Sequence, residues 1–293
     1  MPSNEQRRAA AKRKLERQVA NRTQRARKRK QLTIAASALG VVVAVAAGVG
    51  IYFLTRGDDS TSTTAASASE TPDASLASAA PPAAKAKPAT VTCDYRVAQQ
   101  QPSDRQVTKP GTDNISTAGT PKADLQTSQG PIGITLNPGE SPCTVNSFES
   151  LAKQKFFDNT SCHRMTTGKG LKVLQCGDPT ASGKGGPGYA FDNEYPTDQY
   201  APNDQAAQTP VNYKRGVIAM ANAGPDQTGK GTNGSQFFLV YGDSQLPPQY
   251  TIFGTIDDAG LATLDKVAKA GVTGGGQDGK PATDVTIQSV RID

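Results

Sequence analysis

The sequence predicts a mainly β protein, with a closed eight-stranded antiparallel barrel capped by two helices and preceded by a single transmembrane helix and a disordered linker. Eight short segments with alternating apolar residues, against only two with helical periodicity, predict the barrel. An uncharged stretch of 23 residues near the N-terminus predicts the membrane helix. A tract of Ser, Thr, Ala and Pro after it predicts the linker.

The charge of the chain is divided between two regions. Its 293 residues have a formal net charge of +6, no tryptophan and one histidine, His163. Twelve Lys or Arg residues and two acidic residues lie in 1–31, which carries +10, while the other 262 residues carry −4. This division excludes a basic nucleic-acid-binding surface over the whole protein. The single histidine excludes any mechanism that needs several histidines.

We expect residues 1–31 to form a basic cytoplasmic tail and residues 32–54 to span the cell membrane. At about 1.5 Å per residue, 23 helical residues reach roughly 34 Å, and a hydrocarbon core is about 30 Å thick. The alternative is a cleaved secretory signal, whose apolar region is usually only about 7 to 15 residues long. The basic residues before the span place the N-terminus in the cytoplasm and the rest of the chain outside. The tail has no aromatic residue to stack on a base, so nucleic acid is not its expected partner.

Residues 55–92 are expected to be a disordered linker, because residues 57–90 contain one Leu and no aromatic residue. Such a segment buries too little apolar surface to offset the entropy of ordering. All four cysteines, Cys93, Cys143, Cys162 and Cys176, follow the span, in a compartment where disulfides persist. We expect disulfide bonds between them, and the sequence leaves all three pairings open. A zinc site with Cys162, His163 and Cys176 is the alternative, but it lacks a CxxC pair and a second histidine.

An irregular lead-in segment over 93–120 precedes the predicted barrel domain, 121–293. Helices are expected after Ser141 and Pro142 and after Asp257 and Asp258, where capping residues precede apolar residues at helical spacing. Two helices are too few for the crossovers of a parallel sheet, which favours an antiparallel barrel. The expected strands are 122–127, 131–136, 160–165, 171–175, 216–221, 236–241, 251–256 and 284–292.

Five short motifs follow one another within this domain. They are CHRM at 162–165, VLQCGD at 173–178, MANAGP at 220–225, NGSQFF at 233–238 and YTIFG at 250–254. In this order and with these gaps they resemble the signature blocks of the cyclophilin-type peptidyl-prolyl cis-trans isomerases, over about 121–293. With its tail and span, the chain resembles a membrane-anchored bacterial, actinobacterial-like form. The resemblance implies an eight-stranded barrel closed by two helices, in agreement with the strands counted from periodicity, and no metal or other cofactor.

The resemblance also implies the site residues. Arg164 matches the family's catalytic arginine, and Gln175 matches the glutamine that holds this arginine and the substrate backbone. An arginine suits the task because it stays charged and donates from a rigid fork. The residues that match substrate contacts are Val173, Ala221, Asn222, Gln236, Phe238, Leu246 and Tyr250.

Several positions depart from the family pattern. Lys172 stands where the family has a pocket phenylalanine, and we expect it to weaken the pocket. The segment from Arg164 to Gln175 is three residues longer than usual, so that Leu171 can take the apolar position instead. Gln245 replaces a common tryptophan, and this is expected to weaken the binding of cyclosporin. Tyr250 replaces a histidine, and His163 is expected to form a structural hydrogen bond.

The implied function is the acceleration of Xaa-Pro isomerisation in exported proteins that fold outside the membrane, a rotamase and chaperone role. The expected partners are unfolded or extended polypeptides that contain proline. The alternative is a module that binds proline-containing segments as a holdase or scaffold with little turnover. The insertion over 226–232 borders the expected groove and is expected to affect the choice of substrate.

Overall fold

The computed structural model describes residues 79–98, 105–202 and 204–293 of the chain. The chain divides into two units, Met1–Thr71 and Pro72–Asp293, and the described residues all belong to the second. The predicted tail, span and first part of the linker lie outside the described residues. Among the residues that are described, no helix is long and apolar enough to cross a membrane.

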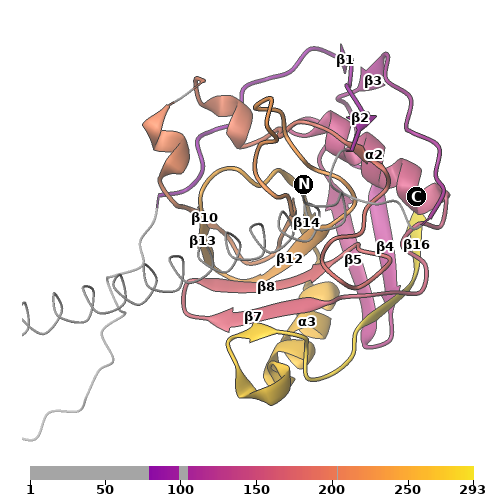
Figure 1. Cartoon of the computed structure of the whole chain (residues 1–293), viewed down its shortest axis with the longest axis vertical. Helices are drawn as coiled ribbons and strands as arrows, with labels where there is room; N and C mark the ends of the chain where they lie inside the picture. Colours follow the sequence, from indigo (N-terminus) through magenta and orange to yellow (C-terminus); the bar gives the residue numbers. More distant parts are fainter. Residues whose placement is uncertain (1–78, 99–104, 203) are drawn as a thin grey trace, which may run out of the picture. The chain divides into compact units, whose positions relative to one another are not determined.

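The described unit is mainly β, with one large antiparallel sheet that forms a half-barrel and two α-helices on opposite sides of the strands (Figure 1). Neighbouring strands of this sheet follow the order β15-β7-β8-β12-β11-β14-β5-β4-β16-β6. The strands are β4 (Lys122–Thr127), β5 (Gly130–Leu136), β6 (Thr160–Ser161), β7 (Arg164–Gly168), β8 (Leu171–Cys176), β11 (Val217–Met220), β12 (Phe237–Gly242), β14 (Ile252–Ile256), β15 (Asp278–Gly279) and β16 (Thr286–Ile292).

Each of the eight segments expected to be strands contributes to this sheet, so the mainly β class with two helices is confirmed. The segment expected at 160–165 is divided, because Cys162 and His163 interrupt the ladder between β6 and β7. β6 pairs with β16, and β7 pairs with β8. One stretch of chain therefore runs from β6, at one end of the half-barrel, to β7, which lies next to β15 at the other end. The sequence predicts a closed barrel instead. β15 is an additional strand that periodicity does not indicate, because it has only two residues.

The two helices begin where the capping residues predict, but only one is capped as expected. The helix α3 (Asp258–Ala270) is capped by Asp257, whose side chain accepts a hydrogen bond from the Gly260 N–H (2.7 Å), and it ends at Gly271, whose φ is 76°. In α2 (Pro142–Lys153), Ser141 occupies the N-cap position without a capping hydrogen bond. Its hydroxyl donates to the Ile252 carbonyl (2.6 Å), and a buried carboxylate from elsewhere in the chain, that of Glu194, caps α2 instead.

Two apolar clusters fill the described unit. The larger lies under α2 and contains the phenylalanine rings of Phe148, Phe157, Phe237 and Phe253, whose edge-to-face and tilted contacts have centroid distances of 5.1 to 5.7 Å. The smaller lies on the other face of β8, β11 and β12 and contains Val173, Val211, Tyr213, Ala219, Phe238, Val240 and Ile252. Since side chains alternate along a strand, these three strands supply both clusters.

Short elements complete the unit. Three two-stranded ladders pair β1 (Thr90–Val91) with β3 (Ile115–Ser116), β2 (Arg96–Val97) with β9 (Tyr189–Ala190), and β10 (Val211–Tyr213) with β13 (Ser244–Leu246). Three short 3-10 helices are η2 (Thr197–Gln199), η3 (Gln205–Gln208) and η4 (Thr273–Gly275).

The end of the predicted linker is ordered, and in this respect the prediction over 55–92 is wrong. The backbone carbonyl of Ala79 accepts a hydrogen bond from the Asn212 N–H of β10 (2.9 Å). Farther along the segment, Lys87 forms an ion pair with Asp198 (2.5 Å). Composition misses this docking because most of its contacts are made by backbone groups and by Lys85 and Lys87, while Val91 packs against the larger apolar cluster. The lead-in segment that follows is irregular apart from its short strands.

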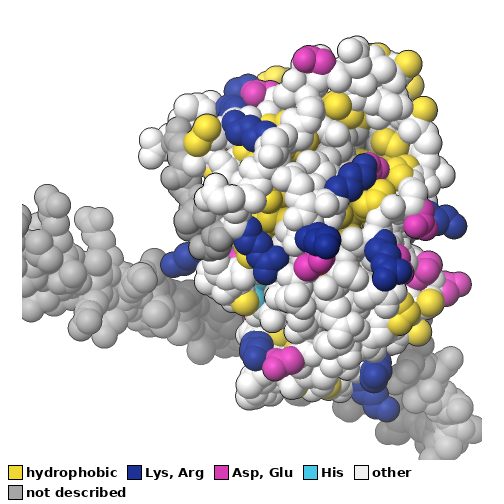
Figure 2. All heavy atoms as spheres, turned by 90° about the vertical axis from the view of Figure 1, so that its right-hand side faces the viewer, with side chains coloured by type: hydrophobic (Ala, Val, Ile, Leu, Met, Phe, Trp, Pro, Cys, Tyr) yellow, Lys and Arg dark blue, Asp and Glu magenta, His cyan; other side chains and the backbone are white. Residues whose placement is uncertain are grey.

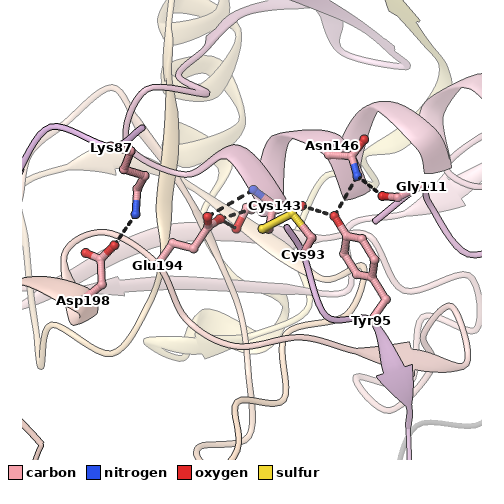
Figure 3. The surroundings of a disulfide bond; sticks show 9 residues. Lys87, Cys93, Tyr95, Gly111, Cys143, Asn146, Glu194 and Asp198 are labelled. Atoms are coloured by element: carbon pink, nitrogen blue, oxygen red, sulfur yellow. Dashed lines mark hydrogen bonds and ion pairs between the residues drawn. A yellow bond between two sulfur atoms is a disulfide. The ribbon is translucent and has the colours of Figure 1, made fainter. Parts of the chain in front are cut away.

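The cysteines form two disulfides, Cys93–Cys143 and Cys162–Cys176, which excludes the zinc alternative. The first bond ties the lead-in segment to the first turn of α2 (Figure 3). Beside it, Tyr95 donates its hydroxyl to the Cys143 carbonyl (2.7 Å) and accepts from the amide of Asn146 (2.9 Å). The lead-in segment is thus held by a covalent bond and by partly buried hydrogen bonds.

Glu194 caps α2 at the same place (Figure 3). Its carboxylate accepts hydrogen bonds from the Cys143 N–H (3.1 Å), the Thr144 N–H (2.8 Å) and the Thr144 hydroxyl (2.7 Å). Burial raises the pKa of this carboxyl above its ordinary value, while these hydrogen bonds act in the opposite direction. The partial positive charge of the helix N-terminus further favours the carboxylate at this position.

Candidate active site

The strands β7, β8 and β12 lie side by side and place four of the predicted site residues, Arg164, Val173, Gln175 and Phe238, on one face. Arg164 on β7 is directly opposite Gln175 on β8, and Gln175 is also opposite Phe238 on β12. Because side chains alternate along a strand, Leu171, Val173 and Gln175 of β8 face the same way. Antiparallel pairing therefore brings together residues from motifs far apart in the sequence.

These residues line a cavity of about 210 Å³. Its volume is below the roughly 300 to 1,000 Å³ of drug-sized ligand pockets, as suits a single side chain. Of the nine predicted site residues, eight line it, and only Gln236 does not. The lining residues are Arg164, Leu171, Val173, Gln175, Ala221, Asn222, Phe238, Leu246 and Tyr250.

One side of the cavity is apolar and rigid. Phe238 is 4% exposed, and the Tyr250 ring meets it edge to face at a centroid distance of 5.8 Å. Behind them, the fully buried Tyr213 donates its hydroxyl to the Tyr250 carbonyl (2.9 Å). Burial raises the pKa of Tyr213, so that its hydroxyl remains a donor. Tyr213 was not predicted from the sequence, because the VNY segment is too short to show a strand period.

The opposite side of the cavity is polar and centres on Arg164. Its Nη1–H donates to Oε1 of Gln175 (3.1 Å). Its Nε–H and Nη2–H donate to the two carboxylate oxygens of Asp278 (2.8 and 2.7 Å). These hydrogen bonds raise the pKa of Arg164 and lower that of Asp278. A fixed positive charge therefore faces an apolar wall across the cavity.

Gln175 and Gln236 continue this network into the protein. The Nε2–H of Gln175 donates to Oε1 of Gln236 (2.9 Å), and the Nε2–H of Gln236 donates to the Gly185 carbonyl (3.0 Å). Each amide donates away from Arg164, so the orientation of both amides is set by the backbone carbonyl at the far end. Gln236 is 7% exposed, and its side chain is hydrogen-bonded to the cavity residue Gln175.

Ala221 and Asn222 form the rim next to β11. The Ala221 N–H donates to the Gln236 carbonyl (2.9 Å). The side-chain amide of Asn222 donates to the Gln249 carbonyl (2.9 Å) and to side-chain oxygens of Asn193 (3.1 Å) and Asn233 (3.2 Å). The Asn222 side chain thus fixes the local backbone, which is what recognition of an extended peptide by main-chain hydrogen bonds requires.

The expectation that Lys172 weakens the pocket is wrong, because Leu171 lines the cavity and Lys172 does not. The longer segment between Arg164 and Gln175 is a hairpin that closes at Gly168 opposite Leu171. The Lys172 stem lies instead against Gly242, where an added Cβ would approach its Cδ to 2.6 Å. The alternation of the strand directs the two neighbours to opposite faces.

His163 lies outside the cavity, although it precedes Arg164 directly. Its Nδ1 is buried and has no hydrogen-bond partner among the described residues, so the expected structural hydrogen bond is not formed through this atom. Burial lowers the pKa of His163, which favours a neutral ring.

A second cavity, of about 450 Å³, lies next to the rim at Ala223. The lead-in segment contributes Arg96, Val97 and Ala98 to its wall, and the insertion over 226–232 contributes further residues. Arg96 joins the two by donating to Asp192 (2.9 Å) and to the Gly231 carbonyl (3.0 Å). The insertion is therefore braced by the lead-in segment.

The charges on the surface of the described unit are mixed. On the face in Figure 2, Lys and Arg side chains are scattered among acidic, apolar and uncharged ones. This face has no continuous basic stripe of the kind that a nucleic-acid backbone requires. Among the described residues there is also no group of three or more His, Cys, Asp or Glu side chains that could hold a metal ion.

Comparison with known proteins gives one family. Residues 122–292 match the model of the family described as cyclophilin type peptidyl-prolyl cis-trans isomerase/CLD. The chain is similar to a probable peptidyl-prolyl cis-trans isomerase B of Mycobacterium leprae, with 64% identity over 59% of this chain and 57% of the relative. A probable peptidyl-prolyl cis-trans isomerase B of Mycobacterium tuberculosis is 65% identical over 58% of this chain and 53% of that protein.

The chain thus spans little more than half the length of these curated relatives. A crystal structure of a cyclophilin type peptidyl-prolyl cis-trans isomerase from Cryptosporidium parvum is also similar. It has 29% sequence identity and a TM-score of 0.46, and the match covers 60% of this chain and 98% of that one.

Proposed function

We propose, from the premise that this chain belongs to the cyclophilin family of peptidyl-prolyl cis-trans isomerases, that it accelerates cis-trans exchange of Xaa-Pro bonds in other polypeptides. The observation that carries the proposal is the position of Arg164, held at the polar side of a cavity whose opposite wall is apolar. A proline ring fits the apolar side, and its amide then lies toward the guanidinium.

The reaction needs little beyond such a site. Rotation about an Xaa-Pro amide has a barrier of about 20 kcal/mol, and the ground-state preference for trans is only about 0.5 to 1 kcal/mol. No covalent bond is made or broken. In the twisted amide the prolyl nitrogen loses its conjugation with the carbonyl, becomes basic and can accept a hydrogen bond. A donor fixed in advance at this nitrogen stabilises the transition state more than the planar ground state.

In this proposal Arg164 donates to the twisted amide, and Gln175 orients Arg164. Phe238, Leu246 and Leu171 hold the proline ring. The backbone at Ala221 and Asn222 holds the extended chain on either side. The reaction needs no nucleophile, because rotation itself restores the planar amide.

Exchange spectroscopy on an Ala-Pro peptide tests the proposal. The cis and trans signals of the peptide should broaden or exchange in the presence of the full chain, and Arg164→Ala should reduce the rate enhancement by about 100-fold or more, the range found when one transition-state donor is removed. Arg215→Ala is the matched control, because Arg215 also forms an ion pair with an aspartate and has a side-chain exposure of 36% against 40% for Arg164.

Binding without turnover is the alternative function, in which the chain holds proline-containing segments as a scaffold. Peptide chemical shifts would then change on binding while the exchange rate between cis and trans stayed at its uncatalysed value. That result with the unmutated protein would refute the isomerase proposal. A third function, RNA binding by a membrane protein through its basic tail, would be favoured instead by loss of function on deletion of residues 1–31 with Arg164→Ala fully active.

The proposal includes a location outside the cytoplasmic membrane, with residues 32–54 as a membrane span and the N-terminus in the cytoplasm. The two disulfides support it, because disulfides persist in oxidising compartments. Folding of exported polypeptides is the corresponding role, since uncatalysed proline isomerisation takes about 10 to 100 s. Protease added to spheroplasts should degrade the described unit and spare an epitope placed before residue 32. Protection of both would contradict this topology.

The preference for substrate rests on the rim of the site. Gln245, at the position of a common tryptophan, lies on β13 beside Leu246, and we propose that it weakens cyclosporin binding. The insertion over 226–232 lines the second cavity and is proposed to select residues near the proline. Gln245→Trp should lower the inhibition constant of cyclosporin, and an unchanged constant would contradict this role.

A further inference from the structure

We infer that Asp278 is a positioning residue for Arg164, which it holds in one orientation so that the remaining guanidinium N–H groups face the proline cavity. Asp278 is not among the cavity-lining residues. It is 114 residues away from Arg164 in sequence, on the two-residue strand β15. The inference rests on the proposed function, because it assigns the control of Arg164 in that reaction.

The contact is two-pronged. The Nε–H and the Nη2–H of Arg164 each donate to one carboxylate oxygen of Asp278, at 2.8 and 2.7 Å. Gln175 accepts from Nη1–H on the other side. Since a guanidinium has five N–H donors, two remain, one on Nη1 and one on Nη2. A planar group held at both ends has little freedom to rotate, so the two remaining N–H groups keep one direction, toward the proline cavity.

Asp278 is itself placed by the backbone rather than by a free loop. β15 pairs with the edge of β7, with Asp278 opposite Thr166 and Gly279 opposite Met165. Next to this ladder, the Thr167 N–H donates to the Gln277 carbonyl (2.9 Å). The carboxylate that holds Arg164 is thus anchored to the strand that carries Arg164. Sites on paired strands hold a side chain more accurately than sites on loops.

The pair is poorly suited to stabilising the fold. The side chains of Arg164 and Asp278 are 40% and 55% exposed, and ion pairs at such positions contribute little to stability. Ordering a long arginine side chain has an entropic cost. Because Asp278 already orders Arg164 in the free protein, this cost is not incurred when the substrate binds. We therefore expect the main effect of Asp278 on the rate of the bound complex and only a small effect on stability.

The described unit contains a matched control. Asp265 also forms a two-pronged contact with an arginine, and accepts from Nη1–H and Nη2–H of Arg215 at 2.7 and 2.8 Å. The side chains of that pair are 36% and 56% exposed. Neither residue lines the proline cavity. Asp265→Ala thus removes an equivalent surface ion pair without touching the site.

The test is exchange spectroscopy of an Ala-Pro peptide with the full chain in detergent micelles. Asp278→Ala should lower kcat about tenfold with little change in KM, because misplacement of a catalytic group lowers the rate more than ground-state binding. Asp278→Glu should restore a large part of kcat, and Asp265→Ala should leave both constants unchanged. An unchanged kcat in Asp278→Ala, or an equal loss in Asp265→Ala, would overturn the inference.

Two further measurements separate positioning from other roles. In an Arg164→Ala background, Asp278→Ala should have no additional effect, because Asp278 acts only through Arg164. A further loss would overturn the inference. The Nε–H signal of Arg164, assigned in ¹⁵N-arginine-labelled protein by its absence in Arg164→Ala, should exchange with water at least tenfold faster in Asp278→Ala, and an unchanged rate would overturn the inference as well.

The same experiments keep this inference apart from the proposed function. If the unmutated chain showed no exchange enhancement, the isomerase proposal would fail, and the Nε–H measurement would still decide whether Asp278 orders Arg164. If the unmutated chain were active while Asp278→Ala kept its kcat, the function would stand and the role of Asp278 would fall.

Discussion

Removal of the Cys93–Cys143 disulfide should lower the free energy of unfolding of the fragment 72–293 by roughly 4 kcal/mol. The bond joins residues 50 apart in sequence, and the entropy of closing a loop of that length in the unfolded chain gives this value. For Cys162–Cys176, with a separation of 14, the same relation gives roughly 3 kcal/mol. The double variants Cys93→Ala/Cys143→Ala and Cys162→Ala/Cys176→Ala therefore form a matched pair.

Urea unfolding followed by far-ultraviolet circular dichroism measures the difference, since the chain has no tryptophan for fluorescence. The Cys93→Ala/Cys143→Ala variant should be the less stable by about 1 kcal/mol. In both variants the free energy of unfolding should also fall more steeply with urea concentration, because the unfolded chain without the disulfide exposes more surface to solvent.

The reverse order of stability would refute the loop-entropy reasoning. A loss of less than about 1 kcal/mol in the free energy of unfolding of the Cys93→Ala/Cys143→Ala variant would refute the assumption that the lead-in segment unfolds together with the rest of the unit. It would show that the lead-in segment opens without the rest of the unit, despite the hydrogen bonds of Tyr95 and Asn146 beside the bond.

Three further predictions concern single side chains. Glu194 binds its proton more tightly in the folded than in the unfolded state, so the free energy of unfolding should fall as pH rises from 4.5 toward the raised pKa of the folded state. Glu194→Gln should remove this pH dependence in urea titrations at several pH values. The same pH dependence in the variant would contradict the prediction. Leu171→Ala should raise KM for an Ala-Pro peptide severalfold, about the effect of one lost apolar contact, while Lys172→Ala should leave KM unchanged. The opposite pattern would show that Lys172, and not Leu171, lines the cavity. Phe238→Leu should keep the fold, because the apolar side chain changes little in volume, and should weaken peptide binding in a chemical-shift titration. Unchanged affinity would mean that Phe238 does not contact the bound proline ring.

Much of the sheet could be predicted because its strands are long and alternate. The KADLQT segment at 122–127 is β4 without any change of bounds. The helix α3 was equally clear, because Asp257 at its start and Gly271 at its end are side-chain and backbone signals within the helix itself. Such local signals need no knowledge of the rest of the chain.

The missed features depend on partners distant in sequence. Asp278 lies in a Gly-rich polar stretch without a period, and its partner Arg164 is 114 residues away. Glu194 caps a helix 50 residues before it, in place of the local Ser141. No local pattern carries this information. For Lys172, the length of the segment between Arg164 and Gln175 already indicated Leu171 as the alternative, and the strand register selects Leu171.

The docking of Ala79 on β10 places an upstream segment of the chain near the predicted proline cavity. β10 pairs with β13, where Leu246 lines the proline cavity, and the hydroxyl of Tyr195 donates to the Pro82 carbonyl (3.0 Å) beside the same apolar cluster. The first described residues of the chain therefore lie at the edge of the site. In steric terms, the docked residues 79–82 would limit the directions in which a peptide, bound as the proposed function requires, can leave the cavity past Leu246.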